Sequence, residues 1–235
     1  MAISVISMAT SFARSKSVRH EAGGQSRSGL ISALASVIAD VRQRDRDRYL
    51  AVLYAPAPLR PALFALHGFD LELASIVVGT TEAMIGEIRL AWWREAVEAI
   101  DRGVVPAQPL LQVIAAELPA RSVSGADLAA LEDRWLGMIG STDVPTAHVE
   151  GGGQLFALTA RLLGAEATVG QQLGEAWVRG DATGLPAVPP VLRPLLGLVR
   201  LAERDARRAR AGLTPEARGS LPRQWTLLKA VAFGR

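Results

Sequence analysis

The stretch "RPALFALHGFDLELASIVVG" (Arg60–Gly79) decides the fold, because it is long and apolar enough for a helix through a core yet carries two carboxylates. Five of its residues recur at alternating spacings of three and four, namely Leu63, Leu66, Asp70, Leu73 and Val77. Such spacing places side chains on one stripe of an α-helix. The sequence therefore predicts one long helix with this stripe turned inward.

The two carboxylates of the stretch, Asp70 and Glu72, cannot form a metal clamp together. Residues two apart on a helix point about 200° away from each other. Asp70 is expected to face a central cavity as a polar wall residue. Glu72 is expected to be solvated or paired with an arginine such as Arg89 or Arg94.

The rest of the chain also follows helical periodicity, and no stretch alternates convincingly with period two. We predict an all-α, single-domain helical bundle over residues 30–235, preceded by a flexible extension over residues 1–29. The glycines of "TAHVEGGGQLFALTARLLG" predict a close crossing of two helices. "SVSGADLAALEDRWLGMIG" predicts a helix that begins at a serine cap.

Composition excludes several classes of site. The chain has no cysteine, so it has neither a disulfide nor a thiolate metal site. Its histidines, His20, His67 and His148, are too far apart to suggest zinc. No apolar run was expected to reach the roughly 18 residues that cross a bilayer. Residues 1–20 contain no acid, and a loose extension is preferred over a targeting segment.

The charge is unevenly distributed. Residues 1–49 carry 8 basic and 4 acidic side chains, residues 50–192 carry 8 and 16, and residues 193–235 carry 10 and 3. Within the basic end, helical spacing gathers four arginines as a contact for an anionic membrane or a protein partner: Arg200, Arg204, Arg207 and Arg208. Partial compensation by Glu203 and Asp205 is the alternative, and no nucleic-acid partner is expected.

From "RDRYLAVLYAPAPLRPALFALHGF" to "EIRLAWWREAV" the chain resembles the squalene/phytoene synthase family, closest to the alphaproteobacterial and mitochondrial branch of complex I assembly factors. The resemblance extends more weakly to the C-terminus. It implies an isoprenoid-synthase-like fold around a central cavity, shortened near residues 178–190.

Enzymes of that family hold Mg²⁺ and diphosphate with two acidic clusters on facing helices. At the positions of the first cluster this chain has Ala74, Ser75 and Val78, none of which offers a carboxylate. Near the second cluster "LGEA" is followed only by Asp181, which is expected to be a turn residue. Both halves of the diphosphate site are therefore incomplete.

A second group of candidates surrounds the "WWR" element. Trp92 and Trp93, with Arg89 and Arg94, could line an isoprenoid pocket with cations for an anionic head. The alternative is that one tryptophan packs inside, the other caps the surface, and the arginines pair with nearby glutamates.

The resemblance and the missing acids together predict a catalytically silent family member that assists respiratory complex I assembly. It is expected to use no catalytic residue, no metal and no cofactor, and to be cytoplasmic with peripheral contact at the inner membrane. The alternatives are a prenyl transferase that uses Mg²⁺, with Asp70 paired to Glu150 or Asp181, and a lipid- or isoprenoid-binding module.

Overall fold

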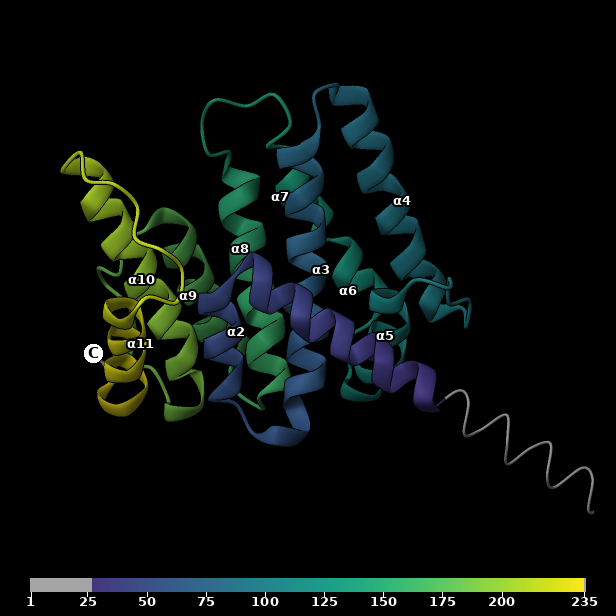
Figure 1. The fold of residues 1–235 in the computed structure, drawn as a ribbon, viewed down its shortest axis with the longest axis horizontal. Coiled ribbons are helices and arrows are strands. Elements are labelled where there is room, and N and C mark those ends of the chain that lie inside the picture. Colours follow the sequence, from purple (N-terminus) through teal and green to yellow (C-terminus); the bar gives the residue numbers. More distant parts are fainter. Residues whose placement is uncertain (1–26, 235) are drawn as a thin grey trace, which may run out of the picture.

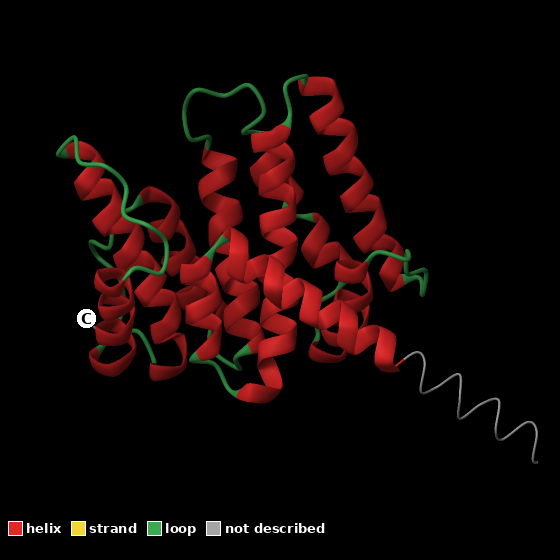
Figure 2. Ribbon diagram, viewed as in Figure 1, coloured by secondary structure: helices red, strands yellow, loops and turns green. Residues whose placement is uncertain are grey.

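The computed structural model of the protein describes residues 27–234, and these residues form helices joined by turns, with no strand among them (Figure 2). A helix runs through residues 27–44. It is followed by α2 (Arg46–Leu53), α3 (Arg60–Gly79), α4 (Ala83–Asp101), α5 (Pro109–Glu117), α6 (Gly125–Ala129), α7 (Glu132–Leu136), α8 (Thr146–Leu162), α9 (Ala167–Arg179), α10 (Arg193–Arg210) and α11 (Leu221–Phe233). Short 3₁₀ turns lie at Ala57–Leu59, Pro119–Arg121 and Pro190–Leu192. The all-α prediction is confirmed.

Helix α3 forms the centre of the bundle, with α4 and α5 on one side and α8 to α11 on the other (Figure 1). Its predicted inward stripe is confirmed: Leu63, Leu66 and Leu73 are buried, and Val77 packs against the same core. The helix over residues 27–44 crosses α3 at Gly68, where an added Cβ would lie 3.3 Å from Val37. The first described helix therefore packs across α3.

Helix α3 also departs from one expectation. By length and composition, Ala57–Gly79 could cross a membrane, although no run this apolar was expected. However, 67% of its most apolar 18-residue window is buried inside the protein. The core helix of a soluble protein passes the same test, so hydropathy here is explained by the helices that cover α3.

Several helices begin at a proline, and one begins at the predicted serine cap. Helices α3, α5, α10 and α11 each have a proline in their first two positions, where the missing N–H costs nothing. Ser124 and Asp127 form a capping box at α6. The helix predicted after Ser124 is nevertheless two, α6 and α7, because a tighter turn from Leu131 N to Leu128 O separates them.

The predicted close crossing lies between α8 and α9 and is confirmed. A Cβ on Gly174 would meet the Gly152 carbonyl oxygen at 2.1 Å, and one on Gly152 would meet Val178 Cγ2 at 2.3 Å. Only glycine at both positions allows the two backbones to approach this closely.

At the chain ends, residues 27–29, which the sequence assigned to the flexible extension, are helical, and residues 1–26 lie outside the described part.

Candidate functional site

The most unusual feature of the interior is a buried ion cluster centred on Asp70. Its Oδ2 accepts a hydrogen bond from Arg48 Nη1 at 2.6 Å, and its Oδ1 accepts from Arg134 Nη1 at 3.0 Å and from Trp135 Nε1 at 2.9 Å. Asp70 has no exposed surface, and Arg48 and Arg134 are only 5% and 1% exposed. Both oxygens of the carboxylate are therefore fully engaged.

Three other helices converge on Asp70 of α3 to build this cluster. Helix α2 supplies Arg48, whose backbone N–H is capped by Asp45 Oδ1 at 3.1 Å. Helix α7 supplies Arg134 and Trp135. Helix α8 closes the site at Gly151, because a Cβ there would lie 2.4 Å from Arg134 Cβ.

Aromatic rings also stabilise the two guanidinium groups of the cluster. The Trp177 ring of α9 has its centroid 4.8 Å from the Arg48 guanidinium carbon and 5.5 Å from that of Arg134. A cation over an aromatic face in a dry interior is stabilised by about 2 kcal/mol. His148 of α8 adds a bond from its Nδ1 to the Arg134 carbonyl oxygen, 2.9 Å away. Asp45 Oδ2 lies 3.3 Å from Arg48 Nε, so two buried guanidinium groups are balanced by two carboxylates in this part of the interior.

The arginines keep Asp70 ionised. Burial alone would raise its pKa, but the charges of Arg134 and Arg48 and the hydrogen bonds from Arg48 and Trp135 outweigh burial and lower the pKa to about 2. His67, one turn away, is the opposite case. Burial, followed by the charge of Arg48, lowers its pKa to about 3 against the smaller opposing effect of Asp70. A carboxylate and a neutral imidazole thus lie side by side on α3.

The structure corrects the expectation that Asp70 lines an open cavity. The space on its side of α3 is filled by Arg48, Arg134 and Trp135. Nearby, on the His67 side of the helix, a void of only 20 Å³ remains among mostly apolar side chains of α2, α3, α8 and α10. That volume holds no more than a water molecule.

Three of the other predicted ligand candidates lie toward the surface rather than around Asp70. Glu72 pairs with Arg44 at 2.8 Å, not with Arg89 or Arg94 as expected. Arg94 instead reaches Glu132 at 3.2 Å and Glu98 at 3.5 Å. Arg89 is exposed.

The two tryptophans are arranged as the second alternative predicted, with one inside the protein and the other at the surface. Trp93 is 6% exposed and meets Phe69 edge to face, whereas Trp92 is 47% exposed. Among the proposed cavity residues only Asp70 and Trp93 reach the interior.

The residues present do not fit the Mg²⁺ that the family's enzymes use. Val78 is 88% exposed, and Ser75 Oγ donates to the Glu72 carbonyl oxygen at 2.7 Å. Asp181 is the turn residue that was predicted, since its Oδ1 accepts from Thr183 N at 2.9 Å. In residues 27–234 no three histidine or acidic side chains are placed to share a metal ion.

The predicted basic stripe on α10 is largely paired within the molecule. Arg204 binds both oxygens of Glu216, at 2.8 and 2.6 Å, and Arg208 lies 3.4 Å from the same carboxylate. Arg200 and Arg207 share Glu203, at 3.3 and 3.4 Å. A membrane or partner contact by these arginines stays a prediction, with less free charge than the sequence suggested.

Sequence reasoning missed Arg48 and Arg134, the two residues that define the cluster. Arginine is rarely buried unless paired, so a lone arginine in an amphipathic segment is assigned to the surface. The only local signal is that Arg134 and Arg48 are the last residues of charged runs, where Trp135 and Tyr49 begin an apolar segment.

Comparison with known proteins finds a protein family whose model matches the part of the chain that contains part of this cluster. Residues 41–133 match the family model for squalene/phytoene synthase, which confirms the predicted resemblance over that segment. The matched segment contains Arg48 and Asp70 and ends one residue before Arg134.

The curated relatives are named NADH dehydrogenase (ubiquinone) complex I, assembly factor 6. The human protein is 39% identical over 70 residues, which is 30% of this chain and 21% of that protein. The rat protein is 32% identical over 97 residues, 41% and 29% of the two chains. A Drosophila melanogaster homolog is 30% identical over 97 residues, 39% and 29%. The aligned part is thus less than a third of each relative's length, and no solved structure matches the chain.

Proposed function

We propose that this chain, whose residues 41–133 carry a squalene/phytoene synthase segment, is a non-catalytic member of that family that assists the assembly of respiratory complex I. The names of the relatives support the assembly role. The same proposal puts the protein in the cytoplasm, in peripheral contact with the inner membrane where complex I is built.

The observation that supports the absence of catalysis is that the Asp70 carboxylate is buried and fully hydrogen-bonded. A working diphosphate site needs carboxylate oxygens that are free to bind Mg²⁺. Here Arg48, Arg134 and Trp135 occupy both oxygens. The two arginines are themselves too buried to receive a diphosphate, so the cluster acts as a structural centre that holds α2, α3 and α7 together.

An activity assay tests this half. The purified protein, incubated with farnesyl or geranylgeranyl diphosphate and Mg²⁺, is expected to release no more pyrophosphate than a heat-killed sample. Magnesium-dependent release above that background would favour the prenyl-transferase alternative.

Gene deletion tests the assembly half, in an organism that makes both this protein and complex I. Loss of the protein should lower the amount of assembled complex I on native gels and leave the other respiratory complexes at normal levels. Expression of the full chain should restore it. A normal complex I level in the deletion strain would contradict the assembly role.

A further inference from the structure

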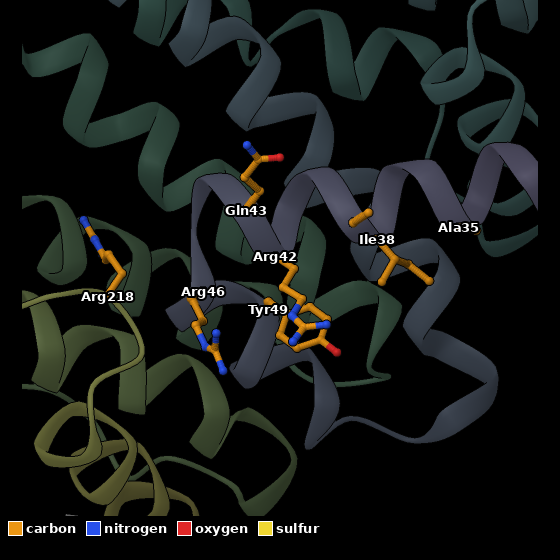
Figure 3. Close-up of a pocket in the computed structure, with 8 residues that line it drawn as sticks. Ala35, Ile38, Arg42, Gln43, Arg46, Tyr49 and Arg218 are labelled. Atoms are coloured by element: carbon orange, nitrogen blue, oxygen red, sulfur yellow. The ribbon is translucent and has the colours of Figure 1, made fainter.

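A second site lies on the surface, away from the Asp70 cluster. A pocket of 660 Å³ opens between the helix over residues 27–44, helix α2 and the loop before α11 (Figure 3). It is lined by Ala35, Ile38, Ala39, Arg42, Gln43, Arg46, Tyr49 and Arg218. One end is therefore apolar and the other carries three arginines.

The arginines at the basic end are held in place by their surroundings. The Arg42 guanidinium carbon lies 5.7 Å from the centroid of the Tyr49 ring, and Figure 3 shows its side chain over that ring. The stem of Arg46 lies against Gly219, where an added Cβ would come within 2.3 Å of Arg46 Cδ. A cation that is already oriented loses less entropy when it binds an anion.

The charge at this end is not compensated. Within residues 27–234, no carboxylate lies within ion-pair distance of Arg42 or Arg46, because the neighbouring acids are engaged elsewhere. Asp40 pairs with Arg44 at 2.8 Å, and Asp45 pairs with Arg48 at 3.3 Å.

The third arginine of the pocket has two carboxylate partners, both of them shared. Arg218 lies 3.2 Å from Asp47, which also binds Arg223 at 2.8 Å, and 3.8 Å from Asp45, which also pairs with Arg48. The pocket therefore carries a surplus of positive charge.

We propose that this pocket binds a phosphate group, with the apolar wall formed by Ala35, Ile38 and Ala39 receiving an apolar part of the same ligand. Guanidinium groups match the oxygen geometry of phosphate and form charge-assisted hydrogen bonds with it. The volume falls within the range of roughly 300–1,000 Å³ that is usual for small-ligand sites.

The chain's own N-terminal segment is a poor occupant on grounds of charge. Residues 1–26 contain Arg14, Lys16 and Arg19 but a single acid, Glu21, so the segment and the pocket have the same sign. The phosphate proposal is independent of the assembly role and of the Asp70 cluster.

Two binding assays on the full chain distinguish the sources of such a phosphate. Calorimetry with glycerol 3-phosphate measures binding of a soluble phosphate. Co-sedimentation compares vesicles of phosphatidylcholine alone with vesicles that also contain phosphatidic acid, at one ionic strength. We expect saturable binding in at least one assay, and the assay that shows it identifies a soluble or a lipid phosphate.

The double variant Arg42→Gln/Arg46→Gln should weaken that binding about tenfold or more, since it removes two charge-assisted donors. The control Arg102→Gln/Lys229→Gln removes the same charge from exposed positions outside the pocket and should stay within about twofold of the wild type. Circular dichroism and urea unfolding confirm that both variants fold. Equal weakening in the two variants, or no binding of either probe by the wild type, would overturn the proposal.

Discussion

At the scale of single residues, Asp70 shows how burial changes what a carboxylate can do. In water an aspartate is a possible metal ligand, but here two guanidinium groups and an indole N–H take its oxygens. Desolvating three charges is costly, and the cluster is stable only because every partner is present. The same residue that the sequence marks as a candidate ligand is therefore a structural counter-ion.

The first prediction follows from this dependence. Asp70→Asn leaves Arg134 buried without a counter-ion and Arg48 with Asp45 alone, so the unfolding free energy should fall by about 3–5 kcal/mol. Urea denaturation measures it. The control is Glu72→Gln on the same helix, whose partly exposed pair with Arg44 should be worth about 0–1 kcal/mol. Similar losses in the two variants would show that the cluster is not a stabilising centre.

The second prediction concerns His67 and acid. Its pKa is 6.5 in the unfolded chain and about 3 in the folded protein. Between pH 3 and 6.5, His67 is therefore protonated in the unfolded chain and neutral in the folded protein. Stability is therefore lost as pH falls from 6.5 toward 3, by about 1.4 kcal/mol per pH unit for one such group. Asp70, with a pKa lowered from 3.8 to about 2, adds a loss in the same direction below pH 3.8.

The variant His67→Phe isolates this contribution, because phenylalanine fills the apolar site without titrating. Its unfolding free energy, measured by urea between pH 4 and 7, should depend less steeply on pH than that of the wild type. His148, whose pKa is also lowered by burial and by Arg134, keeps some of the slope in both proteins. Parallel pH curves for the two proteins would contradict a buried neutral His67.

At the scale of elements, the close crossing of α8 and α9 depends on glycine. Gly152 and Gly174 bring the two backbones together, and Gly151 leaves room for the Arg134 stem. One short segment of α8 thus packs against both α9 and the ion cluster. A change in the crossing would move Gly151, and with it the helix that closes the site.

The third prediction tests this crossing with Gly174→Ala. The added methyl group would overlap the Gly152 backbone, and overpacking of this kind typically costs about 1–3 kcal/mol. Thermal unfolding measures it. In Gly29→Ala the new methyl group meets nothing within 4 Å, and helix propensity should make this control neutral or up to about 1 kcal/mol more stable. Equal melting temperatures would show that α9 can shift without cost.

At the scale of the whole molecule, ion pairs join the two ends of the described chain. Asp47 of α2 binds Arg223 of α11 through Nε at 2.9 Å and Nη2 at 2.8 Å, and it accepts a bond from Gly219 N at 3.0 Å. Arg223 also reaches Asp205 of α10. These ion pairs thus hold together helices that are far apart in sequence. They lie next to the Asp70 cluster and the surface pocket that contains Arg42 and Arg46.

The fourth prediction is that Asp47→Asn loosens the C-terminal helix. Arg223 is 1% exposed and would keep only Asp205, so the free energy of unfolding should fall by about 3 kcal/mol or more. Hydrogen exchange should rise first in α11. Asp143→Asn, at an exposed loop position, is the matched control and should leave both unchanged. Equal rates of hydrogen exchange in α11 of the variant and the wild type would show that Asp47 does not hold this helix in place.

The sequence by itself determined the helical class, the inward stripe of α3, the glycine crossing, the serine cap before α6 and the missing acids at Ala74, Ser75 and Val78. These are local properties, set by periodicity, caps and residue chemistry within about one or two helical turns.

Only the tertiary structure decided which charges meet. Asp70 and Arg134 are 64 residues apart, and Asp47 and Arg223 are 176 apart, so no spacing in the chain reveals either pair. Likewise, the α10 arginines pair with Glu203 and Glu216, whereas within residues 27–234 Arg42 and Arg46 meet no carboxylate. The fold, and not the local composition, brings a carboxylate within reach of a guanidinium.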